Sequence, residues 1–147
     1  MYILGLNLGH DLTVCIVKDG KLIYANEVER LSRKNGHTVL PEHLEHPRGM
    51  LHYIDAALEN CELTLKDISY VGVSEAGYSK YAAKHLKPYF TDDKIYSTPH
   101  HECHASASYY VSPFKEASFL TIDGFGTDGN LTYGVAKDNH LKFLFKN

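Results

Sequence analysis

The segment HHECH, residues 100–104, concentrates three histidines and a cysteine in five positions. On a helix, residues four positions apart lie about 40° apart around the axis and one turn apart along it. His100 and His104 therefore share a face on which two imidazoles can bind one metal ion, whereas His101 points elsewhere. Cys103 lies near that face, but a single cysteine is more often inert packing. A solvated helix start is the alternative reading of the segment.

Asp123 is the candidate third ligand. It ends the expected strand FLTID and is followed by Gly124 and Gly126, where a carboxylate projects into a turn that a ligand backbone or phosphate can approach. Two histidines and one carboxylate with open positions suit iron(II), manganese or zinc better than magnesium or calcium. No helix signal follows DGFGTDG, so this glycine-x-glycine does not indicate a dinucleotide-binding fingerprint.

A second candidate site lies in the turn NLGHD, which contains His10 and Asp11. His10 could donate a hydrogen bond to an anionic or carbonyl oxygen of a substrate. The alternative is that Asp11 has a structural role only and closes the turn through its own backbone. Arg30, in ERLSRK, could clamp a phosphate with two hydrogen bonds, although a charged loop is usually just solvated.

The composition describes the class of protein that carries these residues. The 147 residues are 44% apolar and 22% charged, which is typical of a soluble globular domain. A net charge of -3 provides no basic field for non-specific nucleic-acid binding, and no run approaches the roughly 20 apolar residues of a membrane span. Three widely spaced cysteines argue against a disulfide framework. We therefore predict a cytoplasmic protein that binds neither membrane nor nucleic acid.

The elements that must position the candidate residues can be read from hydrophobic periodicity. Three short strands fill the first thirty residues, a charged surface loop follows at 29–41, and three more strands occupy 118–126, 131–138 and 140–147. Between them, the pattern predicts helices at 42–60, 79–90 and 100–111 and strands at 67–74 and 94–98.

The two groups of three strands resemble each other. At an offset of 119 positions, LTVCIVKDGKLIY (12–24) and LTYGVAKDNHLKF (131–143) are identical at five of thirteen positions. Asn7 falls opposite Asp123 if the second copy has three extra turn residues. A duplicated βββαβα lobe is typical of two-lobed phosphotransferases of the actin, sugar-kinase and heat-shock ATPase type. We therefore predict a first lobe at 1–113 and the opening β-meander of a second lobe at 114–147. Asp123 would then lie across the inter-lobe cleft from the histidines.

Four stretches of the chain resemble one family. They are ILGLNLGHD, EVERLSRKNGH, HHECHASASYYVSPFKEA and FLTIDGFG. They look like N-terminal segments of the O-carbamoyltransferases of nodulation-factor and antibiotic biosynthesis. The resemblance implies an actin-like, ribonuclease H-like α/β domain related to the tRNA threonylcarbamoyladenosine-forming proteins. It also implies that a carbamoyl group passes from carbamoyl phosphate, through an ATP-dependent carbamoyl-adenylate, to a hydroxyl of a sugar or natural product.

The same resemblance assigns roles to the candidate residues. His100, His104 and Asp123 would hold a divalent metal, iron, manganese or zinc, and His10 would be catalytic. The remaining candidates would bind substrate or the co-substrate ATP: Asp11, Arg30, Gly124 and Gly126. Family members usually carry a glutamate soon after aspartate-glycine-x-glycine, whereas Thr127 and Asp128 stand here.

A further ligand, much of the ATP pocket and the adenylate-forming domain are expected beyond residue 147, so we expect a fragment without full activity. The uncovered face of its second meander should be apolar and favour association.

Two other functions fit the pattern. The chain could belong to a threonylcarbamoyl-transfer protein acting on tRNA, or be a non-catalytic nucleotide- or metal-binding module that needs a complementing chain. A homodimer is also open.

Overall fold

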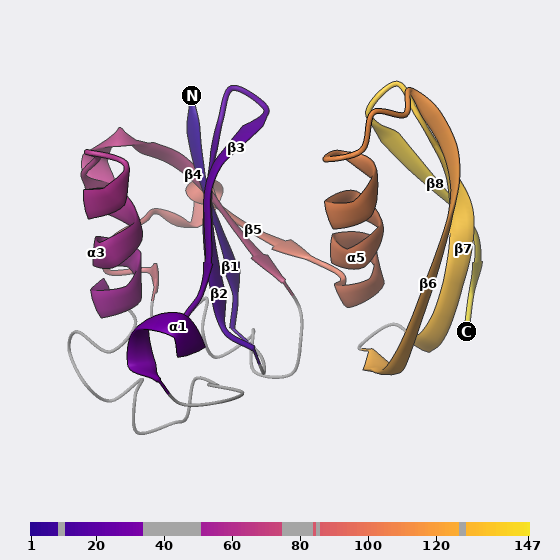
Figure 1. Cartoon of the computed structure of the whole chain (residues 1–147), viewed down its shortest axis with the longest axis horizontal. Helices are drawn as coiled ribbons and strands as arrows, with labels where there is room; N and C mark the ends of the chain where they lie inside the picture. The colour runs from indigo at the N-terminus through magenta and orange to yellow at the C-terminus, as the bar shows by residue number, and fades with distance from the viewer. Residues whose placement is uncertain (9–10, 34–50, 75–83, 85, 127–128) are drawn as a thin grey trace. The chain divides into compact units, whose positions relative to one another are not determined.

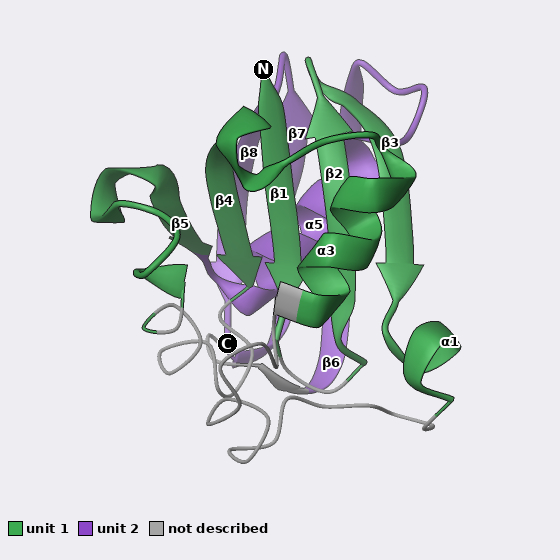
Figure 2. Ribbon diagram, turned by 90° about the vertical axis from the view of Figure 1, so that its left-hand side faces the viewer, with its two compact units in different colours: residues 1–97 green, residues 98–147 purple. Residues whose placement is uncertain are grey.

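The computed structural model describes residues 1–8, 11–33, 51–74, 84, 86–126 and 129–147, and these form two compact units, 1–97 and 98–147 (Figures 1 and 2). The first unit contains a five-stranded sheet in the order β3-β2-β1-β4-β5. β1 runs antiparallel to β2 and parallel to β4. Its strands are β1 (Tyr2–Asn7), β2 (Thr13–Lys18), β3 (Lys21–Glu27), β4 (Ile68–Ser74) and β5 (Ile95–Thr98).

Helix α3 (Leu51–Asn60) covers one face of this sheet over β2 and β3 (Figure 1). Alternate residues of the strands point toward it, as period-2 patterning requires. The core contains Leu4, Leu6, Val14, Ile16, Ile54, Ala57, Leu58, Val71 and Val73. Two short 3-10 helices, η1 (Leu65–Asp67) and η2 (Asp92–Lys94), lead into β4 and β5.

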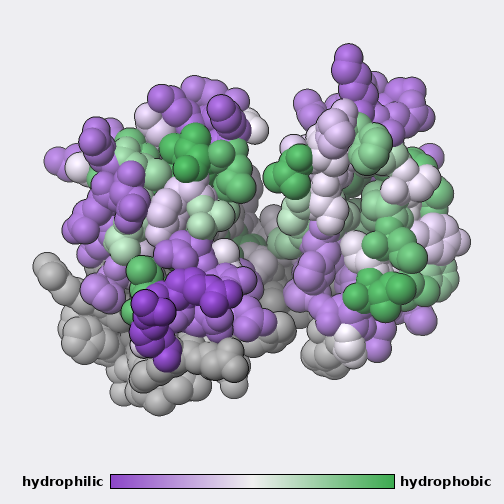
Figure 3. Space-filling view, in the orientation of Figure 1, coloured by the Kyte–Doolittle hydropathy of each residue, from purple (hydrophilic) through white to green (hydrophobic). Residues whose placement is uncertain are grey.

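The second unit is a three-stranded antiparallel sheet, with helix α5 (His100–Tyr109) packed against β6 and β7. The strands are β6 (Glu116–Gly126), β7 (Gly129–Lys137) and β8 (His140–Lys146). The opposite face of this sheet exposes apolar side chains, and hydrophobic surface gathers on the strand side of the unit in Figure 3. These exposed side chains are Leu120, Ile122, Tyr133, Val135 and Phe145. The expected uncovered apolar face is therefore present among the described residues.

The turns of the two meanders support the internal repeat. Asp19 and Gly20 have φ of 49° and 82°, and Asp138 and Asn139, at the 119-residue offset, have φ of 49° and 62°. Positive φ at both central residues of a two-residue loop is the pattern of a type I′ hairpin turn, which matches the twist of antiparallel strands. The same backbone solution thus recurs at the same place in both copies.

The strand ladders refine the alignment of the repeat. Asn7 pairs with Thr13, and Thr132, the counterpart of Thr13 at the offset, pairs with Thr121. Asn7 therefore corresponds to Thr121, and the alignment of Asn7 with Asp123 was wrong by two residues. Because side chains alternate with a period of two, the error leaves Asp123 on the expected face.

The ladders also show which face of the second sheet is uncovered. Val135 and Tyr133 are the counterparts of Ile16 and Val14, whose side chains lie in the core with α3. Their pairs on β6, Ser118 and Leu120, are exposed like them. The exposed face of the second sheet thus corresponds to the face that α3 covers in the first.

Several sequence expectations need correction. The loop expected from residue 29 begins with helix α1 (Glu29–Ser32), and the last helix ends at Tyr109, not at residue 111. The start of the helix expected at 42–60 and most of the helix expected at 79–90 lie outside the described residues. The lobe boundary expected after residue 113 stays a prediction, although α5 is grouped with the second sheet.

No helix in the described ranges is long and apolar enough to cross a membrane.

Candidate metal site

Helix α5 is oriented by one buried face. His101, Ala105 and Tyr109 recur every four residues and are 0%, 1% and 8% exposed. Residues at this spacing lie on one side of a helix, and here that side packs against β6 and β7. His100 and His104 start one position earlier on the helix, so they lie along the border between the buried side and solvent.

Strand β6 brings the carboxylate. Thr121 and Asp123 are two residues apart and point to the α5 side of the sheet, where Thr121 is buried. The strand continues past Asp123 to Gly126, where the expected strand 118–126 also ends, with a register shift between Ile122 and Gly126. Such an irregularity re-aims side chains near a sheet end. The Gly124 N–H donates to Asp123 Oδ1 over 2.6 Å, which leaves Oδ2 directed at the helix.

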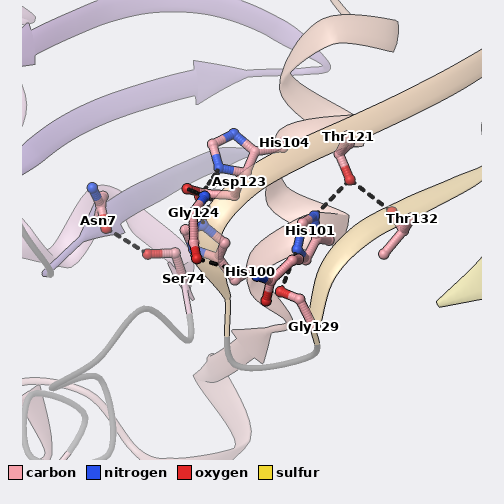
Figure 4. A network of polar contacts seen from close by, with 11 residues as sticks. Asn7, Ser74, His100, His101, His104, Thr121, Asp123, Gly124, Gly129 and Thr132 are labelled. Atoms are coloured by element: carbon pink, nitrogen blue, oxygen red, sulfur yellow. Dashed lines mark hydrogen bonds and ion pairs between the residues drawn. The ribbon is translucent and has the colours of Figure 1, made fainter. Parts of the chain in front are cut away.

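Three ligand atoms converge at this point (Figure 4). His100 Nε2 lies 2.6 Å from Asp123 Oδ2, His104 Nε2 lies 3.4 Å from the same oxygen, and the two Nε2 atoms are 3.1 Å apart. These three residues are a group of potential ligands whose donor atoms all lie within 4.8 Å of one another. The structure therefore brings together the three predicted metal ligands.

One hydrogen bond does not account for all three contacts. If His100 Nε2 carries the proton that bonds Asp123, it has no lone pair left to accept a proton from His104 Nε2, yet the two nitrogens are 3.1 Å apart. A metal at about 2.1 Å from each ligand places neighbouring ligand atoms about 3.0 to 3.4 Å apart, for angles between 90° and 109°. The 3.1 Å and 3.4 Å separations lie in this range, whereas the 2.6 Å between His100 Nε2 and Asp123 Oδ2 is a hydrogen-bond distance, so a shared cation requires these two atoms to move slightly apart.

The charge of Asp123 also suits a cation. The hydrogen bond from His100 is the main cause that lowers the pKa of Asp123 to about 2, and the Gly124 N–H and His104 contribute in the same direction, whereas burial opposes them. The carboxylate is thus ionised at neutral pH. It presents one negative oxygen to two imidazoles.

Asp123 and the histidines lie in one compact unit, residues 98–147. The expectation that an inter-lobe cleft separates them was wrong for this chain. The reason is the packing of α5 directly on β6, through His101 and Ala105, which no local pattern specifies.

The other predicted site residues have different surroundings. His10 lies outside the described residues. Asp11 has φ of 56°, and its carbonyl accepts hydrogen bonds from Asn7 Nδ2 and Thr13 Oγ1, so its backbone closes the turn as the alternative reading expected. Arg30 is exposed and forms ion pairs with Glu27 and Glu29. Asp11 and Arg30 belong to the first unit.

Of the two predicted glycines, Gly124 is exposed, and a Cβ built on it would meet nothing within 4 Å. Open space therefore lies beside the Asp123 backbone. Gly126 pairs with Gly129 across the hairpin.

Sequence reasoning missed the polar residues beneath the site. His101 Nδ1 lies 2.6 Å from Thr121 Oγ1, and Thr121 Oγ1 lies 2.7 Å from Thr132 Oγ1. Thr121 and Thr132 interrupt apolar strands at positions that face inward, and this was the available signal. Cys103 Sγ contacts the Thr98 carbonyl at 3.5 Å and is not in the ligand group.

Comparison with known proteins identifies the family. Residues 52–146, which include α5 and all of β6 and β7, match the model of the carbamoyltransferase N-terminus. This chain belongs to that family. Its resemblance to the carbamoyltransferases is thereby confirmed, as is its assignment to a transferase family.

Two curated relatives are uncharacterized proteins. MJ1051 of Methanocaldococcus jannaschii is 27% identical over 144 residues, which are 97% of this chain and 26% of that protein. The protein sll1178 of Synechocystis is 27% identical over 181 residues, covering 95% of this chain and 28% of that protein. This chain thus spans about a quarter of the length of these relatives.

Solved structures confirm the fold class. YeaZ from Pseudomonas aeruginosa has a TM-score of 0.57 at 8% identity, over 98% of this chain and 64% of that one. The activator of the 2-hydroxyisocaproyl-CoA dehydratase from Clostridium difficile, with bound ADPNP, has a TM-score of 0.56 at 21% identity, over 100% and 45%. A Ppx/GppA protein from Aquifex aeolicus has a TM-score of 0.51 at 15% identity, over 100% and 51%. This chain therefore has the predicted actin-like α/β fold.

Proposed function

We propose that this chain is the metal-bearing N-terminal part of an O-carbamoyltransferase. The complete enzyme would transfer a carbamoyl group from carbamoyl phosphate, through an ATP-dependent carbamoyl-adenylate, to a hydroxyl of a sugar or natural product. Membership of the family supports carbamoyl transfer in general. The observation that carries the proposal is the convergence of His100, His104 and Asp123 on one point, inside the segment that matches the family.

In this proposal, the two imidazoles and the Asp123 carboxylate hold iron(II), manganese or zinc. A bound divalent metal supplies Lewis-acid character and offsets the charge of phosphate oxygens. Asp123 is suited to this task because its pKa of about 2 keeps it ionised without proton loss on binding. The histidines must bind in their neutral form, so metal affinity falls when they are protonated.

Gly124 gives the site access to a substrate. It is exposed, no Cβ occupies the space above its backbone, and its N–H already orients the Asp123 carboxylate. We infer that Gly124 and Gly126 line the approach of ATP or carbamoyl phosphate. Asp11 and Arg30 remain candidates for nucleotide binding and His10 for catalysis. For Arg30 this requires release of its guanidinium from Glu27 and Glu29.

The proposed reaction is tested by following labelled carbamoyl phosphate. The protein is loaded with manganese and incubated with carbamoyl-labelled carbamoyl phosphate, ATP and a pool of hydroxyl-bearing sugars. Label in a sugar product, lost in the His100→Ala, His104→Ala double variant, supports the proposal. Because the chain spans about a quarter of the length of its relatives, the assay is run on this chain and on the full-length relative MJ1051.

The same assay separates the alternatives. Label from bicarbonate that enters tRNA in the presence of threonine and ATP, but never a sugar, would replace the proposal with threonylcarbamoyl transfer. Binding of metal and nucleotide without transfer by either protein would favour a non-catalytic module. If wild type and the double variant contain the same amount of metal by elemental analysis, the ligand assignment is wrong.

A further inference from the structure

A buried histidine lies next to the proposed ligands but bonds elsewhere. The side chain of His101 is fully buried, and both of its ring nitrogens have partners (Figure 4). Nδ1 lies 2.6 Å from Thr121 Oγ1 on β6, and Nε2 lies 2.8 Å from the Gly129 carbonyl oxygen, where β7 begins. His101 thus connects one helix to two strands.

These bonds have a fixed direction when the ring is neutral. A carbonyl oxygen can only accept, so Nε2 carries the hydrogen and donates to Gly129. Nδ1 is then an acceptor, and the Thr121 hydroxyl donates to it. The Thr121 oxygen in turn accepts from the Thr132 hydroxyl, 2.7 Å away. Thr132 is fully buried and Thr121 is 9% exposed, so each bond satisfies a group whose burial is otherwise costly.

The positions of the partners give these bonds a consequence for the site. Thr121 precedes Asp123 by two residues on the same face of β6, and His101 lies between the ligands His100 and His104 on α5. Gly129 has φ of 113°, a conformation that side chains disfavour, and it is the first residue of β7, paired with Gly126 at the end of β6. The bonds of His101 therefore fix both the rotation of α5 about its axis and the distance of the helix from the Asp123 carboxylate.

We propose that His101 is a positioning residue: it holds α5 against β6 and the start of β7 so that His100 and His104 meet Asp123 at metal-binding distance. The inference rests on the proposed metal site. A packing role alone would need no polar atoms here, because an apolar side chain fills such a space without the cost of burying two nitrogens. The directed bonds give an orientation that apolar contacts do not.

Cobalt(II) binding tests this role, because the visible absorption of the ion reports its coordination and chelator competition gives its affinity. His101→Leu removes both bonds. His101→Gln keeps one donor, because its side-chain amide nitrogen lies about as far from the backbone as the imidazole Nε2. Thr121→Val preserves shape and removes the donor to Nδ1. Ser108→Ala is the matched control on α5, since the hydrogen bond that Ser108 Oγ donates goes to the helix's own His104 carbonyl.

We expect His101→Leu and Thr121→Val to weaken cobalt binding about tenfold or more and to change its spectrum, as loss of groups that orient ligands does elsewhere. His101→Gln should retain part of the affinity, and Ser108→Ala should match wild type. Melting curves identify any variant that does not fold, and Thr121→Val then carries the test.

Folded His101→Leu or Thr121→Val with wild-type affinity and spectrum would overturn the positioning role while the metal site stands. Wild type that binds no cobalt, iron, manganese or zinc would overturn the metal site and the inference with it.

Discussion

The side chain of His104 offers a clean separation of metal binding from folding. It is 53% exposed, and its Nε2 contacts are to His100 and Asp123, the other members of the site. Loss of exposed polar contacts costs little, so His104→Ala should lower the free energy of unfolding by about 1 kcal/mol or less. For a chain of this size, that corresponds to a drop in melting temperature of roughly 4 °C at most.

The effect on metal affinity should be far larger. Loss of an outer partner of a metal ligand already costs about 10- to 100-fold, so loss of one of three direct ligands should exceed about 100-fold, or about 2.7 kcal/mol. Chelator competition with zinc and manganese measures the affinity, and thermal melting of the metal-free protein measures stability. His52→Ala is the matched control, because His52 is an exposed histidine on α3, in the other unit.

An affinity of His104→Ala within about threefold of wild type would refute the metal site, because each ligand bond contributes well over that factor. A large fall in melting temperature with unchanged affinity would assign His104 to folding instead. His100 is less suitable for the same experiment because it is 9% exposed, so its removal also leaves a void.

Three further predictions follow from other contacts. The pKa of Asp123, lowered to about 2, means that the ionised carboxylate contributes stability that is present above the unfolded pKa near 3.8 and is lost as the pH falls toward 2. In urea melts of metal-free protein, the difference in stability between wild type and Asp123→Asn should therefore narrow as the pH falls below about 4, and a difference that widens there would contradict the sign. Replacing Leu120 and Ile122, which are 62% and 75% exposed, with threonine should reduce self-association in sedimentation without loss of melting temperature. Unchanged association would show that this exposed face of the second sheet does not cause it. Gly5→Ala would place its Cβ against Cys15 Sγ and should cost about 1 to 3 kcal/mol in denaturant melts, largely relieved by Cys15→Ala; additive effects of the two changes would show that they do not touch.

The last of these contacts recurs in the second meander with the roles exchanged. Gly5 pairs with Cys15, and the equivalent pair is Phe119 with Gly134, where a Cβ would meet the Phe119 ring. In each copy one glycine makes room for the larger side chain across the ladder. The repeat therefore extends from hairpin turns to packing, although sequence identity at these positions is absent.

Much of the architecture follows from the sequence because it depends on neighbours in the chain. Period-2 alternation determines the strands, and Asp19-Gly20 and Asp138-Asn139 determine two hairpins, since both effects act within a few residues. The four-residue spacing of His100 and His104 likewise fixes a shared helix face. The place of Asp123 at a strand end before two glycines added it to this pair as a candidate, and the matched segment confirmed the family.

The tertiary structure decided what lies opposite that face. His100 and Asp123 are 23 residues apart in sequence, and their contact depends on how α5 rests on the second sheet. The sequence assigned His101 no part because a helix pattern does not tell which side packs inward when both sides carry histidine. The structure shows that His101 packs inward and bonds to β6 and β7, whereas His100 and His104 converge with Asp123 at the proposed metal site.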